Sequence, residues 1–255
     1  MIEIRGIKSL NTDNIFWLII GADKNVVVVD PGEAKPIMDY IEECSLKPDS
    51  IIITHEHPDH IGGIQAIVDK FQCPVLGPKN ESIESVTHPM AEGNSFERIG
   101  IKFEVLALPG HTSSHIGFIV NNEHFFCGDT ILGGGCGKVP ESAGNTMLDS
   151  LRKCMQLYPQ MKLYWGHELT EPNLLFAQKV EPDNQDVANR LKLAQENIST
   201  SGFDAPGTLS EELKTNPFLR IEHADVVLSV EEKYSAKLST SYEVFAALLQ
   251  WKSEG

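Results

Sequence analysis

The chain has 255 residues, of which 41% are hydrophobic. That is enough for a substantial core and fits one large α/β domain or a main domain with a smaller one. The 36 acidic and 21 basic residues give a net charge of −15. This balance argues against nucleic acid as a partner, because phosphate binding needs clustered lysine and arginine side chains. An anionic substrate would have to meet a local group of cations instead.

Neither a membrane segment nor a disulfide framework is expected. No apolar run approaches the roughly 20 residues that a membrane span requires, and the first residues lack the apolar core of a signal peptide. The five cysteines are odd in number and contain no Cys-x-x-Cys pair. Reduced thiols and a cytoplasmic location are therefore the expectation.

Strands alternate with helices through the first two thirds of the chain. β-Branched and alternating apolar runs predict strands over 15–20, 26–30, 51–53, 74–76, 101–108, 116–120, 123–126 and 161–165. Amphipathic patterns predict helices over 34–44, 64–71 and 148–157. Residues 81–97 are polar and are expected to be irregular.

Beyond His167 the strand signals almost disappear. Helices are predicted over 171–180, 186–197, 209–214 and 243–252. Thr208 and Glu211 have the spacing of a capping box, which supports the third of these helices. We therefore expect two domains, a catalytic domain over residues 1–168 and a small helical domain over residues 169–255. The helical domain would form a wall of the site or hold the tail of the substrate.

The segment Thr54–Gly63 places three histidines and one aspartate directly after a predicted buried strand. Imidazole nitrogens and carboxylate oxygens are ligands of zinc, manganese and iron. His55 and His57 are two residues apart and can point to one side, while Asp59 and His60 can serve a second centre. The alternative is a polar loop that holds histidines by chance, but the pattern is too specific to favour it.

Three more candidate ligands stand where a predicted strand gives way to a loop. They are His111, Asp129 and His167. A single histidine is more often structural than ligating, but four strand ends of the same character favour one shared site. Asp129 stands apart from both histidine groups and can offer two oxygens, so it is the best candidate for a bridge between two metal ions.

Together these residues predict a two-metal site. The candidate metal ligands are His55, His57 and His111 at one centre, Asp59, His60 and His167 at the other, and Asp129 between them. A metal ion lowers the pKa of its water from 15.7 toward about 7. The resulting bridging hydroxide would attack an electrophilic carbonyl or phosphorus. No catalytic residue beyond the metal ligands is then required, and no nucleophilic serine or cysteine is predicted.

Two other features border the predicted site. Asp30 is either a turn residue or a carboxylate that orients a metal ligand, and the sequence slightly favours the turn. The glycine-rich segment Gly133–Lys138 lacks the spacing of a phosphate-binding P-loop and is expected to shape the substrate site. Lys138 could pair with a substrate carboxylate, although a solvated surface lysine is an equally good interpretation. Cys127 and Cys136 are assigned a packing role.

These motifs resemble those of the metallo-β-lactamase superfamily and, within it, the glyoxalase II (hydroxyacylglutathione hydrolase) family. The superfamily likeness rests on Thr54–His60, Pro109–Thr112, Gly128–Thr130 and Gly166–Glu168. The narrower likeness rests on Gly135–Lys138, Gly166–Thr170, Asn173–Leu174, Val180–Pro182 and Asn216–Arg220. The resemblance covers almost the whole chain. It implies a four-layer αβ/βα sandwich followed by a small all-helical domain.

The resemblance also implies an activity, which is hydrolysis of S-D-lactoylglutathione to D-lactate and glutathione in methylglyoxal detoxification. It implies two divalent metal ions on the seven ligands, usually zinc, with iron or manganese in its place in some members. Lys138 and Lys252 are expected to bind the substrate. The expected partner is a small-molecule thioester, bound by a monomer that contacts neither nucleic acid nor membrane.

Three positions depart from the usual pattern of the family. Pro140 and Leu169 stand where the family commonly has tyrosine, and Leu249 stands where it has an arginine that holds a glutathione carboxylate. These departures leave the metal chemistry unchanged and predict weak affinity for glutathione or a different thiol carrier. The alternatives are a persulfide dioxygenase, which uses a single iron, and a non-catalytic metal-binding scaffold protein.

Overall fold

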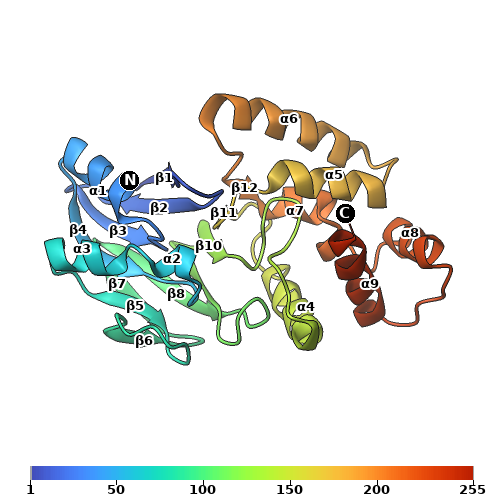
Figure 1. Ribbon diagram of the computed structural model, residues 1–255, viewed down its shortest axis with the longest axis horizontal. Helices are drawn as coiled ribbons and strands as arrows, with labels where there is room; N and C mark the ends of the chain where they lie inside the picture. Colours follow the sequence, from blue (N-terminus) through green and yellow to red (C-terminus); the bar gives the residue numbers. More distant parts are fainter. Residues whose placement is uncertain (1, 255) are drawn as a thin grey trace.

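The computed structural model describes residues 2–254, whose strands form two six-stranded mixed sheets (Figure 1). The first sheet contains, in spatial order, β1 (Glu3–Lys8), β2 (Ile15–Ile20), β3 (Asn25–Val29), β4 (Lys47–Ile52), β5 (Val75–Pro78) and β6 (His88–Met90). The second contains β12 (Gly207–Thr208), β11 (Lys162–Trp165), β10 (His124–Gly128), β9 (Ile116–Val120), β8 (Ile101–Ala107) and β7 (Ser95–Arg98).

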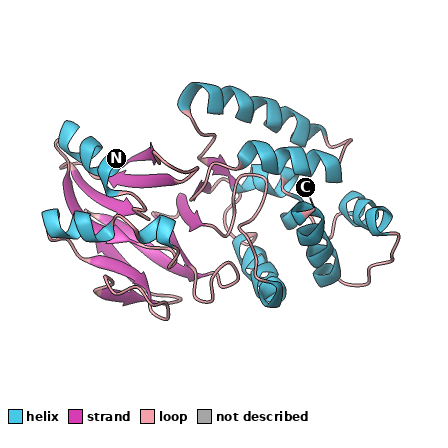
Figure 2. Ribbon diagram, viewed as in Figure 1, coloured by secondary structure: helices cyan, strands magenta, loops and turns pink. Residues whose placement is uncertain are grey.

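Helices pack on both sides of these sheets and fill the C-terminal part of the chain (Figure 2). The helices beside the sheets are α1 (Ala34–Glu43), α2 (Pro58–Ile61), α3 (Ile64–Phe71) and α4 (Gly144–Cys154). The C-terminal helices are α5 (Thr170–Val180), α6 (Gln185–Ser201), α7 (Leu209–Thr215), α8 (Ala224–Tyr234) and α9 (Ser241–Ser253). Among residues 2–254, no helix has the length and apolar character to span a membrane.

Two hydrophobic cores hold the layers together. In one, Ile37 of α1 and Ile64 of α3 pack against apolar side chains of β2, β3 and β4. The other joins the facing sides of the two sheets and continues into α4 and the C-terminal helices, with Trp17, Phe103 and Phe118 among its members. Because successive strand residues point to opposite faces, the alternating apolar residues of β2 contribute to both cores. The predicted four-layer sandwich with an added helical part is confirmed.

The structure corrects several predicted elements. Strands β1, β6, β7 and β12 and helix α8 were not predicted, and the expectation that residues 81–97 are irregular is wrong at β6 and β7. These strands are short or lie near sheet edges, and many of their side chains are exposed. Helix α8 buries only Val226 and Val230. The hydrophobic pattern of these segments is therefore too weak to identify them.

The two sheets are tied together at one end by backbone hydrogen bonds. The amide of Ile116 on β9 donates to the carbonyl of Thr54 after β4, at 2.9 Å. The amide of Ile15 on β2 donates to the carbonyl of Gly166 after β11, at 2.8 Å. These bonds bring the ends of strands from both sheets to one place. Candidate ligands follow β4 and β11 there, and His111 and Asp129 follow the neighbouring strands β8 and β10 of the second sheet.

The C-terminal helices are joined to the second sheet rather than merely appended to it. Strand β12 pairs antiparallel with β11, with Thr208 opposite Lys162. The same Thr208 forms the predicted capping box with Glu211 at the start of α7. The helical part thus contributes one strand to the sandwich and begins its third helix directly from that strand.

We expect Gly128→Ala to destabilise the fold. Gly128 has φ +50°, and a Cβ atom there would lie 2.5 Å from Thr54 Oγ1 and 2.7 Å from His115 Nε2. The loss in free energy of unfolding should be about 1 to 3 kcal/mol, as for other overpacked sites, measured by denaturant unfolding. The matched control is Gly144→Ala at the first turn of α4, where an added Cβ atom would meet no described atom within 4 Å outside the adjacent residues and the helix backbone. Equal free energies of unfolding for the two variants would show that position 128 does not require glycine.

Candidate metal centre

The first group of candidate ligands is a cluster of three histidines. His55 and His57 follow β4, and His111 lies in the loop after β8. Nδ1 of His57 lies 3.1 Å from Nε2 of His55 and 2.9 Å from Nε2 of His111. His55 is fully buried and His111 is nearly so. Three imidazole nitrogens therefore lie close enough together to hold one metal ion.

The second group combines two histidines with a carboxylate. Asp59 and His60 belong to the short helix α2, and His167 follows β11. The Nε2 atoms of His60 and His167 are 3.2 Å apart. Asp59 Oδ2 lies 3.3 Å from Nε2 of His167 and 3.6 Å from Nε2 of His60. The three residues form a second group that could hold a metal ion.

Asp129, at the end of β10, lies between the two groups. Its Oδ2 atom is 3.3 Å from Nε2 of His111 in the first group and 3.1 Å from Nε2 of His167 in the second. Its Oδ1 atom is 3.5 Å from Nε2 of His60 and has no hydrogen-bond partner among residues 2–254, although Asp129 is only 4% exposed. The structure thus brings all seven predicted ligand residues together, with one carboxylate touching both groups.

Asp30 orients one of these histidines, so the turn interpretation favoured by the sequence is incomplete. Asp30 does lie in a turn, with φ +47°. Its carboxylate also accepts hydrogen bonds from the amide and hydroxyl of Thr54, at 2.7 and 2.6 Å, and lies 3.1 Å from Nδ1 of His60. A proton held on Nδ1 leaves Nε2 of His60 free to face the centre, which is the usual support of a metal-binding histidine.

Two further histidines are oriented in the same way. Nδ1 of His111 lies 2.7 Å from the backbone carbonyl of Lys138, which can only accept a hydrogen bond. Nδ1 of His167 lies 2.8 Å from a carboxylate oxygen of Asp13. Each contact fixes the proton on Nδ1 and directs the Nε2 lone pair into the site.

His115 is a site residue that the sequence analysis missed. Its ring is fully buried and stacks on His55, with ring centroids 4.9 Å apart. Nε2 of His115 accepts the amide hydrogen of Asp129 at 3.2 Å. Burial lowers the pKa of His115 to about 3, so the ring is neutral and can accept this bond. The only sequence signal is its position four residues after His111, at the start of β9.

The pKa values of the buried histidines are shifted in opposite directions in the two groups of candidate ligands. Burial, assisted by the charge of His60, holds the pKa of His55 well below its usual value. Burial acts in the same direction on His60, but the Asp129 carboxylate overcomes it and raises the pKa of His60 to about 10. His167 behaves likewise, since hydrogen bonds with Asp129 and Asp59 outweigh burial and raise its pKa to about 11. The carboxylates thus concentrate negative charge that favours any cation placed beside them.

Two glycines permit this close packing. A Cβ atom on Gly166 would lie 2.5 Å from Asp129 Oδ1 and 2.6 Å from Cε1 of His60. A Cβ atom on Gly137 would lie 2.2 Å from the carbonyl oxygen of Asp129. Only glycine at these two positions allows the backbone to approach Asp129 this closely.

The donor set fits divalent metal ions. Ligand atoms 2.0–2.1 Å from one tetrahedral zinc ion lie about 3.3 Å from one another, and most of the separations within each group are close to that value. A ring nitrogen presents a lone pair to the site when the proton is on the other nitrogen of the ring. Two such lone pairs would repel each other at these distances unless a cation lay between them. A buried carboxylate oxygen without a partner fits the same interpretation. Imidazole and carboxylate ligands suit zinc, iron and manganese alike.

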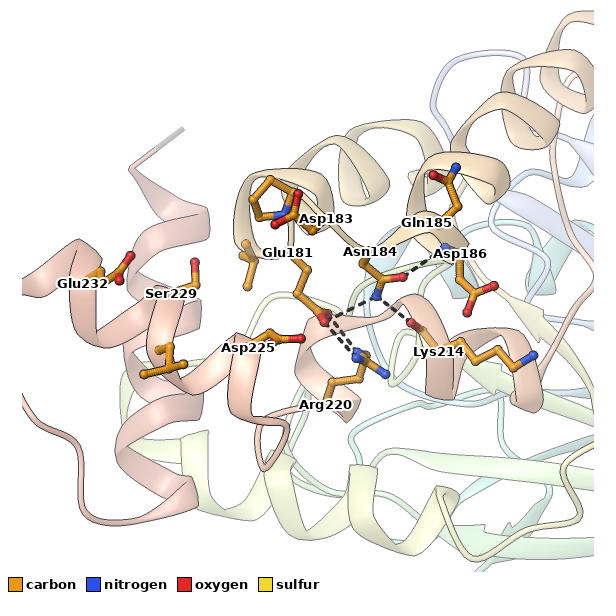
Figure 3. A pocket seen from close by; sticks show the side chains of 13 residues that line it. Glu181, Asp183, Asn184, Gln185, Asp186, Lys214, Arg220, Asp225, Ser229 and Glu232 are labelled. Carbon is orange, nitrogen blue, oxygen red and sulfur yellow. Dashed lines mark hydrogen bonds and ion pairs between the residues drawn. The ribbon is translucent and has the colours of Figure 1, made fainter.

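One further group of side chains, in the helical part, does not fit a metal ion. It consists of Glu181, His223 and Asp225, of which Glu181 and Asp225 line a polar pocket (Figure 3). Both carboxylate oxygens of Glu181 accept hydrogen bonds from Arg220, at 2.8 Å each. His223 Nδ1 is 3.9 Å from the nearer oxygen of Glu181. The Arg220 guanidinium already neutralises the only buried carboxylate of this group.

The two predicted substrate lysines lie outside the ligand groups. Lys138 is exposed on the glycine-rich loop between β10 and α4. Lys252 is half-buried on α9, with its Nζ atom 5.4 Å from the ring centroid of Phe218. Burial lowers the pKa of Lys252, while the neighbouring Cys136 thiol, on the same loop as Lys138, opposes that shift.

Comparisons with known proteins match the whole chain to one family. Residues 10–167 match the family described as "Metallo-beta-lactamase superfamily", and residues 168–254 match "Hydroxyacylglutathione hydrolase C-terminus". The chain is 43% identical to the hydroxyacylglutathione hydrolase of Vibrio parahaemolyticus serotype O3:K6, with 100% of both chains covered. It is 36% identical to the hydroxyacylglutathione hydrolase of Nitrosomonas eutropha, with 99% of both covered.

Solved structures share the fold at lower identity. ETHE1 from Myxococcus xanthus superposes with a TM-score of 0.66 at 21% identity, covering 99% of each chain. The BLEG-1 B3 metallo-beta-lactamase superposes with a TM-score of 0.65 at 19% identity, covering 85% of this chain and 99% of its own. At these identities the likeness shows the fold alone.

We expect Asp30→Asn to weaken metal binding. The change removes the charge beside Nδ1 of His60, and the loss of such a supporting carboxylate typically lowers metal affinity about 10- to 100-fold. Chelator competition with the metal-stripped protein measures the affinity. Asp39→Asn, which removes one exposed carboxylate on α1, is the control and should bind metal as the wild type does. Equal affinities of the two variants would show that Asp30 does not support the site.

Proposed function

Because the chain belongs to the hydroxyacylglutathione hydrolase family of the metallo-β-lactamase superfamily, we propose that it hydrolyses S-D-lactoylglutathione to D-lactate and glutathione. The single observation that carries this proposal is the full-length match to relatives of that name, which includes the C-terminal helical part. The convergence of the seven candidate ligands supports it, because thioester hydrolysis needs both a nucleophile and stabilisation of negative charge on the carbonyl oxygen.

The proposed metal ligands are the residues of the two groups with Asp129 between them. His55, His57 and His111 would hold one divalent ion, and Asp59, His60 and His167 the other. We propose zinc for both, with iron or manganese as alternatives that the same donors accept. When bound, such ions supply a nucleophilic water at neutral pH and polarise the thioester carbonyl.

The other residues of the site orient the proposed metal ligands. Asp30, Asp13 and the carbonyl of Lys138 keep protons on the outer nitrogens of three histidines. Neutral His115 holds the backbone of Asp129. These contacts fix the direction of each lone pair before a substrate arrives, so little reorganisation is needed during the reaction. The proposal requires no separate general base and no cysteine nucleophile, and burial raises the pKa of Cys136 to about 11.

Lys138 and Lys252 are the proposed substrate-binding cations. Lys138 belongs to the glycine-rich loop and Lys252 to α9, and the loop residue Cys136 interacts electrostatically with Lys252. In a chain of net charge −15, we propose that these two lysines form the local cationic group that an anionic substrate requires. Leu169 and Leu249 are half-buried against the core and offer no charge. We propose that these two leucines weaken the binding of glutathione or favour another thiol carrier.

The two regions of the chain have separate proposed roles. Residues 1–168 would form the catalytic domain and residues 169–255 the substrate-binding domain, a division supported by two family matches that meet between residues 167 and 168. The chain would act as a monomer on a small-molecule thioester. All five cysteines are free thiols, which supports a cytoplasmic location. Names of the full-length relatives do not favour the alternative of a persulfide dioxygenase.

Turnover of thioesters that differ only in the thiol tests the proposal. Metal-loaded protein should remove the thioester absorbance of S-D-lactoylglutathione, and a panel that includes other thiol carriers should rank them. We expect measurable hydrolysis of the glutathione thioester, since the metal chemistry does not depend on the carrier. If protein that holds two metal ions per chain cleaves no thioester of the panel, the proposed activity is wrong.

We expect Lys138→Ala and Lys252→Ala to raise KM more than they lower kcat. A cation that binds the substrate carboxylate holds ground state and transition state equally, so its loss appears mainly in KM. Steady-state kinetics on the preferred thioester provide both constants. Lys192→Ala, which removes an exposed lysine of α6, is the matched control. A fall in kcat equal to the fall in kcat/KM would assign these lysines to the chemical step instead.

A further inference from the structure

Buried polar side chains of the helical part hold the backbone of the glycine-rich loop. The amide of Gly134 donates to both carboxylate oxygens of Glu212 on α7, at 3.1 Å each. The side-chain amide of Asn173 on α5 donates to the carbonyl of Gly133 at 3.1 Å, and that of Asn216 donates to the carbonyl of Gly135 at 2.9 Å. The three side chains are at most 2% exposed.

Glu212 is the central residue of this group and forms a buried ion pair with an arginine of a neighbouring helix. Nη2 of Arg190 on α6 lies 2.5 Å from Oε1 of Glu212, and Asn216 Nδ2 donates to Oε2 at 2.8 Å. A buried ion pair is seldom needed for stability, because apolar side chains of the same size often serve as well. An apolar side chain would leave the buried amide of Gly134 without an acceptor. The Glu212 carboxylate is therefore needed as the acceptor for the loop amide of Gly134.

The loop is packed so closely that it cannot shift independently of this group. Gly134 has φ +73°, which favours glycine, and a Cβ atom on Gly135 would lie 2.6 Å from Cγ of Asn173. On its other side, the loop carries Gly137, whose amide donates to the carbonyl of Asp129 at 3.0 Å. The loop is thus held between the helical part and a proposed ligand.

Two residues of the proposed active site depend directly on this loop. The carbonyl of Lys138 accepts the Nδ1 hydrogen of His111 at 2.7 Å, and the side chain of the same residue is a proposed substrate cation. Only Gly135, Cys136 and Gly137 separate Lys138 from the amide that Glu212 binds. A displacement of Gly134 would therefore move both the imidazole of His111 and the substrate lysine.

We propose that Glu212 is a positioning residue whose carboxylate, held by Arg190, fixes the glycine-rich loop and thereby places Lys138 and the imidazole of His111. The inference rests on the proposed function, in which these two groups bind substrate and metal. It assigns the helical part a second role, because this part then supports the metal centre of the sandwich as well as the substrate. Glu212 itself touches neither the substrate nor a metal ion.

The chain offers a matched control for the test. Glu181 is also a buried carboxylate of the helical part, 3% exposed, and is paired with an arginine, Arg220 (Figure 3). Among the described contacts it makes none with the glycine-rich loop. Glu181→Gln and Glu212→Gln each remove one negative charge from a buried Glu–Arg pair, so both should lower the melting temperature.

The two variants should differ at the active site. For Glu212→Gln we expect KM for the thioester to rise about tenfold, and metal affinity in chelator competition to fall about tenfold, as for other residues that orient a ligand. Glu181→Gln should keep both values within about twofold of the wild type. Wild-type values in Glu212→Gln, or equal changes in the two variants, would overturn the positioning role.

A measurement on the wild-type protein covers the case in which Glu212→Gln fails to fold. Native-state hydrogen exchange should show the Gly134 amide protected like the core amides of β10, and exchange at the rate of an exposed loop would overturn the proposal. A wrong proposed function can be distinguished from a wrong role for Glu212. If the proposed function is wrong, the wild-type protein cleaves no thioester, while metal affinity and amide exchange still report on Glu212.

Discussion

The carboxylate of Asp129 is the constraint on which the rest of the structure depends. One of its oxygens lies within 3.3 Å of histidines from two separate groups, and the other has no hydrogen-bond partner among the described residues although Asp129 is buried. A buried carboxylate is stable only when charges or hydrogen bonds surround it. Strands from both sheets end around it, and Gly137 and Gly166 leave room for the close approach. The convergence of these strand ends on one anion explains why the sandwich places its chemistry at this edge.

The seven candidate ligands could be selected from the sequence, because each is a histidine or an aspartate at or shortly after the end of a predicted strand. Local patterns also predicted most strands and helices, while the four-layer sandwich was implied by the resemblance to the metallo-β-lactamase superfamily. The supporting residues could not be found in this way. Asp30 binds Thr54 across 24 residues of sequence and His115 stacks on a ring 60 positions earlier, so their roles depend on how distant segments pack. Edge strands such as β6 were missed because exposed side chains carry no periodic apolar signal.

The proposed metal ligands and the proposed substrate-binding lysines lie on different parts of the fold. The proposed ligands belong to the sandwich, while the proposed substrate-binding lysines belong to the glycine-rich loop and to α9. The loop joins the two regions physically, since it contacts Asp129 and His111 on one side and the buried Glu212 on the other. The helical part is therefore coupled to the metal centre through the loop.

Metal restoration of the chelator-treated protein tests whether two metal ions joined by Asp129 are required for hydrolysis. Hydrolysis of S-D-lactoylglutathione is followed while zinc is added in fractions of an equivalent, in parallel for the wild type and for Asp129→Asn. We expect wild-type activity to rise to a plateau at two equivalents per chain, and Asp129→Asn to remain inactive with weakened metal occupancy. Full activity without added metal, or undiminished activity in Asp129→Asn, would contradict this expectation.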